Sequence, residues 1–119
     1  DRTLKLIDFG LATRFLGCVP REQFLEIAGT SHYMAPETML DGKSSPASDV
    51  WSLGVLLYVL LTGVMLLPKD DERKKLCLKK RRYVQRRLEG CTDLQRRAAS
   101  AQVRDLLGQM LQLEPSKRI

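Results

Sequence analysis

The chain has 119 residues, of which 44% are hydrophobic and 29% charged, and its formal net charge is +6. This composition is that of an ordinary globular domain. Three cysteines without C-x-x-C spacing argue against a disulfide framework or a zinc site and favour a reducing compartment. We therefore expect a cytoplasmic protein, and no signal or transit segment is visible. Because the sequence begins at Asp1 and not at Met, we expect an excerpt of a longer one.

The first part of the chain predicts short strands and a loop. Residues 4–7 alternate weakly and run into Asp8-Phe9-Gly10, which predicts a short strand that ends in a glycine turn. Residues 11–13 are a candidate second strand. Residues 14–28 contain Gly17 and Pro20 without any sustained periodicity, which predicts a long surface loop.

A short helix is predicted over Pro36–Leu40, and a longer one over Ser45–Gly63. Ser45 can cap the longer helix, Pro46 suits its first position, and Gly63 can adopt the left-handed conformation that ends a helix. Its apolar residues do not keep to one stripe but go all the way round the helix. A helix of this kind must be surrounded by other elements, so we expect it to lie at the centre of the fold.

A membrane span is the alternative interpretation of this central helix. The apolar run continues from Val50 to Leu67, which is 18 residues, and basic residues follow it. Polar residues and glycines within the run weaken this alternative without excluding it.

The remaining predicted helices include a strongly basic stretch. Residues 71–88 predict one helix with a narrow apolar stripe, ended by Gly90, and Ser100 is a good cap for a last helix over residues 101–111. Lys69–Arg87 holds ten basic and three acidic residues, a net charge of +7. Within it, Lys79–Arg82 could be a nuclear address or a patch for nucleic acid or anionic lipid, but we favour a solvated helix face.

Four motifs stand in a characteristic order. They are D-F-G at residues 8–10, G-T-S-H-Y-M-A-P-E at 29–37, D-V-W-S-L-G at 49–54 and L-E-P-S-K-R-I at 113–119. Together they resemble the C-terminal lobe of a eukaryotic Ser/Thr protein kinase. The resemblance spans nearly the whole chain and implies a partial kinase domain over residues 1–119. Its fold would be mainly α, with short N-terminal strands and a helical bundle around one buried central helix, and no membrane span.

Within the kinases, the chain is most similar to the calcium/calmodulin-dependent group and to plant and protist calcium-dependent protein kinases. It departs from that group after Gly63, where Val64–Pro68 replaces the usual Pro-Phe pair. No EF-hand loop motif is present in these residues, so calcium control cannot be inferred from them.

The resemblance implies roles for particular residues. Asp8 would be catalytic and would bind Mg²⁺ that bridges the phosphates of ATP, with Phe9 and Gly10 beside it. Thr30 matches the threonine near the catalytic loop that marks Ser/Thr kinases. Ile27, Ser31 and Met34 would form the wall that contacts the substrate residue after the phosphorylated one.

Further residues would be structural or regulatory. Glu37 and Arg118 would form a buried ion pair between the activation segment and the last helices, and Asp49 would anchor the catalytic loop from the central helix. Many kinases need a phosphate nine positions before the Ala of A-P-E, a position that Glu26 occupies here. Because residues 14–29 contain no Ser, Thr or Tyr, we expect Glu26 to replace that phosphate.

The chain contains no Gly-rich loop, strand Lys or H-R-D-x-x-x-x-N loop, so the resemblance implies that these parts lie outside it. We expect a kinase that transfers the γ-phosphate of ATP to protein Ser or Thr, with an N-terminal lobe in cis as partner and with no nucleic-acid or membrane partner. The 119 residues alone would be inactive and poorly stable. A pseudokinase or regulatory scaffold, and a membrane-anchored basic segment, remain as alternatives.

Overall fold

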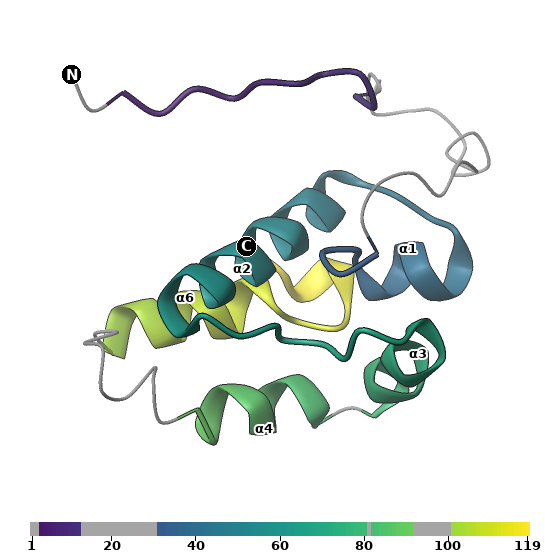
Figure 1. The fold of residues 1–119 in the computed structure, drawn as a ribbon, viewed down its shortest axis with the longest axis vertical. Helices are drawn as coiled ribbons and strands as arrows, with labels where there is room; N and C mark the ends of the chain where they lie inside the picture. The colour runs from purple at the N-terminus through teal and green to yellow at the C-terminus, as the bar shows by residue number, and fades with distance from the viewer. Residues whose placement is uncertain (1–2, 13–30, 81, 92–100) are drawn as a thin grey trace.

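A computed structural model describes residues 3–12, 31–80, 82–91 and 101–119 of the chain. The helices gather on one side of an extended N-terminal segment (Figure 1). In chain order they are α1 (Pro36–Asp41), α2 (Pro46–Thr62), α3 (Asp71–Lys79), α4 (Tyr83–Glu89), α6 (Ala101–Met110) and the 3₁₀ helix η2 (Pro115–Lys117). The prediction of a mainly helical fold built on the helix over residues 45–63 is confirmed.

The ends of α2 are fixed by its own sequence. Ser45 and Ser48 form a capping box, in which the Ser45 backbone N–H donates to Ser48 Oγ at 3.1 Å, and Pro46 takes the first helical turn. Gly63 ends the helix with a φ of 74°, in the left-handed region that glycine tolerates best. The predicted start and end of the central helix are therefore confirmed.

The core lies along one face of α2 and is completed by residues of the other elements. Fully buried side chains of α2 meet residues from the later elements, and α6 packs directly along α2. A Cβ at Gly54 would lie 3.0 Å from both Met110 Cβ and Leu111 Cδ2, so the absence of a side chain at Gly54 lets the two helices approach. The core is made of Met34, Ala35, Met39, Trp51, Val55, Tyr58, Leu66, Leu67, Leu78, Val84, Leu107 and Leu111.

One face of α2 is not covered, contrary to the expectation that other elements surround it. The side chains of Leu53, Leu56 and Leu60 are 57%, 41% and 72% exposed. The described helices pack on the opposite face, through Trp51 and Tyr58. No helix among the described residues is long and apolar enough to cross a membrane.

The predicted N-terminal strands are wrong for the part of the chain that the structure describes. Residues 3–12 form an exposed, extended segment with a turn, in which the Ala12 backbone N–H donates to the Phe9 carbonyl at 3.0 Å. A strand requires a neighbour to pair its backbone groups, and Figure 1 shows this segment standing clear of the helices. Thr13 lies outside the described residues.

The single helix predicted over residues 71–88 is also wrong, because the chain breaks after Lys79 into α3 and α4. Leu78 and Val84 are both buried, at 3% and 4% exposure. At ~100° per residue, side chains six positions apart on one straight helix would point ~120° away from each other. The extended conformation of Lys80, with φ −88° and ψ 103°, lets both enter the same core. Gly90 follows the last residue of α4, as predicted.

Candidate functional site

Residues 31–37, which we call the anchored segment, lead into α1 and carry most of the described site residues. Met34 and Ala35 are buried at 9% and 1% exposure, and the Met34 N–H donates to the Ser31 carbonyl at 3.4 Å. The segment therefore begins with a turn at Ser31, and its residues Met34 and Ala35 are buried in the core. Among the described residues, three anchors from other elements hold it in place, namely Lys74, Ser52 and Arg118, and Ser48 assists the third.

The first anchor is Lys74 of α3. Its side chain is fully buried, and its ammonium donates to Ser31 Oγ at 2.9 Å and to Asp71 Oδ1 at 2.6 Å. Hydrogen bonds from Lys74 and then from Ser31 lower the pKa of the exposed Asp71 carboxyl. The three side chains thus form one hydrogen-bonded group that joins α3 to the start of the anchored segment.

The second anchor is Ser52 of α2. Its hydroxyl is 2.8 Å from the Tyr33 carbonyl, to which it donates, and 3.2 Å from the Ser48 carbonyl one helical turn earlier. A hydroxyl of this kind provides a hydrogen-bond donor for a backbone acceptor near the core. The central helix thereby fixes the backbone of the anchored segment at Tyr33.

The third anchor is Arg118, after η2, which binds Glu37 at the start of α1. Two parallel hydrogen bonds join them, from Arg118 Nη1 to Glu37 Oε1 at 2.6 Å and from Nη2 to Oε2 at 2.7 Å. The side chain of Arg118 is fully buried and that of Glu37 is 11% exposed. The structure therefore brings these two residues together across 81 positions of sequence in the fork-to-fork arrangement that is strongest for this pair.

The surroundings of the Glu37–Arg118 pair satisfy both charges. Arg118 Nη1 also donates to the Ala47 carbonyl at 2.8 Å, and its guanidinium lies 5.2 Å from the centre of the Trp51 ring. Ser48 Oγ donates to Glu37 Oε1 at 2.8 Å. Burial alone would raise the pKa of the Glu37 carboxyl, but the hydrogen bonds from Arg118, its own backbone and Ser48 outweigh it and lower this pKa.

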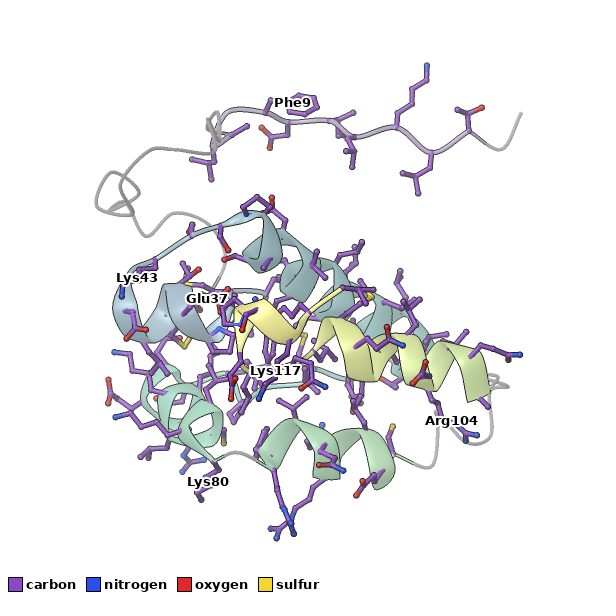
Figure 2. All side chains as sticks on the ribbon, turned by 180° about the vertical axis from the view of Figure 1, so that it is seen from behind. Phe9, Glu37, Lys43, Lys80, Arg104 and Lys117 are labelled. Atoms are coloured by element: carbon purple, nitrogen blue, oxygen red, sulfur yellow. The ribbon has the colours of Figure 1, made fainter. Side chains whose placement is uncertain are left out.

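The Asp8-Phe9-Gly10 segment lies apart from the anchored segment. Figure 2 shows Phe9 on the extended N-terminal segment, well away from Glu37. Asp8 is exposed and has a φ of 64°, in the left-handed region that few residues other than glycine adopt and that Asp tolerates. Its carboxylate is therefore presented to solvent at a sharp change of chain direction.

The structure describes only some of the other predicted site residues. Asp49 lies exposed in the first turn of α2. Glu26, Ile27 and Thr30 lie outside the described residues. Of the predicted set, the structure thus brings Ser31 and Met34 together in one turn and Glu37 against Arg118, and it leaves Asp8 separate from both.

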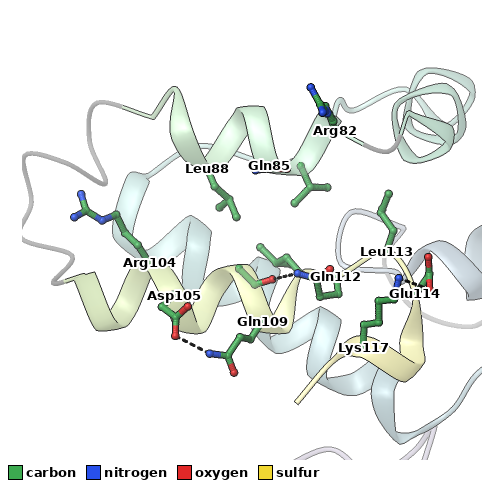
Figure 3. Close-up of a pocket in the computed structure, with 13 residues that line it drawn as sticks. Arg82, Gln85, Leu88, Arg104, Asp105, Gln109, Gln112, Leu113, Glu114 and Lys117 are labelled. Carbon is green, nitrogen blue, oxygen red and sulfur yellow. Dashed lines mark hydrogen bonds and ion pairs between the residues drawn. The ribbon is translucent and has the colours of Figure 1, made fainter.

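A hollow between α4 and α6 contains none of the predicted site residues (Figure 3). Its polar side chains largely bind neighbours on their own element. Gln109 donates to Asp105 at 2.6 Å, Gln112 to the Gly108 carbonyl at 2.8 Å, and Lys117 lies 2.9 Å from Glu114. The anchored segment, rather than this hollow, is therefore the candidate site.

Sequence reasoning missed two of the three anchors. Ser52 stands inside the D-V-W-S-L-G motif, but nothing in the motif alone assigns it a hydrogen bond to Tyr33. Lys74 is one of ten basic residues between Lys69 and Arg87, and only its spacing of three from Asp71 marks it. Lys75 and Glu72 have the same spacing, so this signal does not single out the buried lysine.

The whole chain matches the protein-family model described as "Protein kinase domain", over residues 1–119. It is 39% identical over 122 aligned positions to calcium-dependent protein kinase 21 of Oryza sativa subsp. japonica, covering 100% of this chain and 20% of the relative. It is 38% identical over 119 positions to calcium-dependent protein kinase 13 of Arabidopsis thaliana, covering 98% and 20%. The chain thus spans about a fifth of the length of the curated relatives that it matches.

Proposed function

The chain belongs to the protein kinase domain family, and on that premise we propose that it is part of a Ser/Thr protein kinase that transfers the γ-phosphate of ATP to Ser or Thr of a protein substrate. The observation that carries the proposal is the anchored segment, because kinase activity requires a rigid surface on which the substrate peptide is oriented. Its sequence, which ends in Ala35-Pro36-Glu37, is the one that the family resemblance assigns to that surface.

In this proposal Asp8 holds Mg²⁺. A hard cation needs oxygen ligands, and Mg²⁺ in kinase sites is bound by one or two carboxylates together with phosphate oxygens. The exposed carboxylate of Asp8 fits that donor set. When bound, the ion neutralises charge on the ATP phosphates. Ser31 and Met34 contact the residue that follows the phosphorylated one, and Thr30 marks the preference for Ser and Thr.

The junction after α2 bears on the alternative, a pseudokinase or regulatory scaffold. Val64–Pro68 departs from the Pro-Phe pair of similar kinases, which argues for altered function. In the structure Leu66 and Leu67 of this junction are buried, at 0% and 2% exposure. The departure therefore contributes to the core, which supports a packing role for it.

The experiment that tests the proposal is transfer of radiolabelled γ-phosphate from ATP to a library of Ser and Thr peptides by the full-length protein. We expect incorporation that depends on Mg²⁺. We expect none from residues 1–119 alone, because they include no catalytic base for the substrate hydroxyl. A full-length protein that binds ATP and folds but labels no peptide would establish the scaffold alternative.

A second prediction concerns Glu26, which we propose replaces an activating phosphate permanently. A carboxylate carries about one negative charge where a phosphate carries ~1.5–2, and it can still pair with an Arg and order a loop. We expect Glu26→Gln to lower the activity of the phosphatase-treated full-length protein about tenfold, with unchanged circular dichroism. Glu22→Gln, four positions earlier in the same stretch, is the control. Equal activities of the Glu26→Gln and unmodified proteins would refute the role.

A further inference from the structure

We propose that Lys74 is a positioning residue that sets the substrate wall of the anchored segment and thereby determines selectivity for the residue after the phosphorylated Ser or Thr. The inference rests on the proposed kinase function. Lys74 stands 43 positions beyond Ser31 in a basic stretch that no motif includes, and yet it is the side chain of α3 that binds the predicted wall.

The burial of Lys74 is the first argument. Its side chain is 0% exposed, whereas its ionic partner Asp71 is 61% exposed. A buried ammonium is costly to remove from water, and an apolar residue of similar size would often stabilise the fold as well or better. The cost of burying this ammonium is therefore offset by the groups that it binds. These are Ser31 Oγ at 2.9 Å and Asp71 Oδ1 at 2.6 Å.

The neighbouring pair provides a comparison within the same helix. Lys75 lies 3.4 Å from Glu72 with the same spacing of three, and their side chains are 43% and 81% exposed. An exposed pair of this kind contributes little, about 0–1 kcal/mol. Lys74 differs from Lys75 in being buried and in having a second partner outside α3.

The hydrogen bond from Lys74 affects the position of Met34 through Ser31. Ser31 Oγ is held by Lys74, and the Ser31 carbonyl accepts the backbone N–H of Met34. Met34 is the other described residue predicted to contact the substrate. Without the ammonium, Ser31 can change rotamer. The turn that positions Met34 then loses one of the two side-chain hydrogen bonds that hold it. The other, the Ser52 hydrogen bond to Tyr33, remains.

The test uses Lys74→Met and Ser31→Ala in the full-length protein, with Lys75→Met as the matched control. Lys74→Met removes the charge and keeps the length of the side chain, whereas Ser31→Ala removes the acceptor and tests the same contact if Lys74→Met fails to fold. A lost hydrogen bond of about 0.5–1.5 kcal/mol corresponds to about a two- to tenfold change. We expect both variants to raise the KM for the preferred peptide by that factor and to reduce discrimination among residues after the phosphorylated one.

Several readouts separate positioning from a general loss of structure. In Lys74→Met the KM for ATP and kcat should stay within about twofold, and the double variant should resemble the single ones because both changes break the same contact. Lys75→Met should leave every value unchanged. Unaltered peptide KM and selectivity in both variants, or an equal loss with all peptides and with ATP, would overturn the proposal.

Amide hydrogen exchange tests the contact without reference to activity. In the full-length protein, residues 31–35 should exchange faster in Lys74→Met than in the unmodified protein and in Lys75→Met. If the unmodified protein transfers no phosphate, the kinase function fails, and the selectivity part of this proposal is overturned with it. Unchanged exchange in Lys74→Met would refute the positioning role itself, whether or not the protein is active.

Discussion

Replacing Arg118 with Met is expected to destabilise the protein by about 3–5 kcal/mol, since it leaves Glu37 as a buried carboxylate without its ionic partner. The two parallel hydrogen bonds at 2.6 and 2.7 Å would be lost together. The Ala47 carbonyl would lose a donor and the Trp51 ring its cation. Chemical denaturation of the full-length protein, followed by circular dichroism, measures the effect.

The matched control is Lys117→Met, one residue earlier. Lys117 pairs with Glu114 at 2.9 Å, but the two side chains are 58% and 50% exposed, so its loss should cost at most about 1 kcal/mol. Equal effects of the two substitutions would contradict the buried character of the Glu37–Arg118 pair.

The stability that this pair contributes should depend on pH with a definite sign. Because the pKa of Glu37 is lowered in the folded state, the contribution is present above the ordinary carboxyl pKa of about 4.3 and is lost as the pH falls through the lower, folded value. In Arg118→Met, protonation of Glu37 relieves a buried charge. The difference in unfolding free energy between the two proteins should therefore be largest near neutral pH and shrink in acid.

The sequence predicts the parts of the fold that local chemistry determines. Ser45, Pro46 and Gly63 define the central helix because caps and a left-handed terminus act within a few residues of the backbone they satisfy. The pairing of Glu37 with Arg118 was expected only because the motifs that contain them resemble a known family. No local pattern links two residues so far apart in sequence.

The features that the sequence did not reveal depend on tertiary geometry. Lys74 and the partly exposed Lys75 have the same spacing of three from an acidic residue, and only the packing of α3 against α1 decides which lysine is buried. The break after Lys79 follows from the need to bury both Leu78 and Val84 in one core. A strand over residues 4–7 was predicted from weak alternation, and a second one over residues 11–13, but a strand also requires a partner, which a single stretch of sequence does not specify.

The largest loss of activity is expected for Asp8→Asn in the full-length protein, since it removes the negative charge that we propose holds Mg²⁺ while keeping the size of the side chain. Asn retains one oxygen, so Asp8→Ala is a second variant that removes the ligand entirely. An electrostatic contribution that acts on the transferred phosphate is typically worth about 10²–10³ in kcat. We expect at least a hundredfold loss in both variants, with the peptide KM little changed.

The most direct test of kinase function in this protein is therefore phosphate transfer measured side by side for the unmodified protein, Asp8→Asn and the control Asp41→Asn, which changes an exposed residue at the end of α1. The proposed kinase function predicts Mg²⁺-dependent labelling of Ser or Thr peptides by the unmodified and Asp41→Asn proteins, and a rate at least about a hundredfold lower for Asp8→Asn. Equal rates for all three folded proteins, or no labelling by any of them, would contradict it.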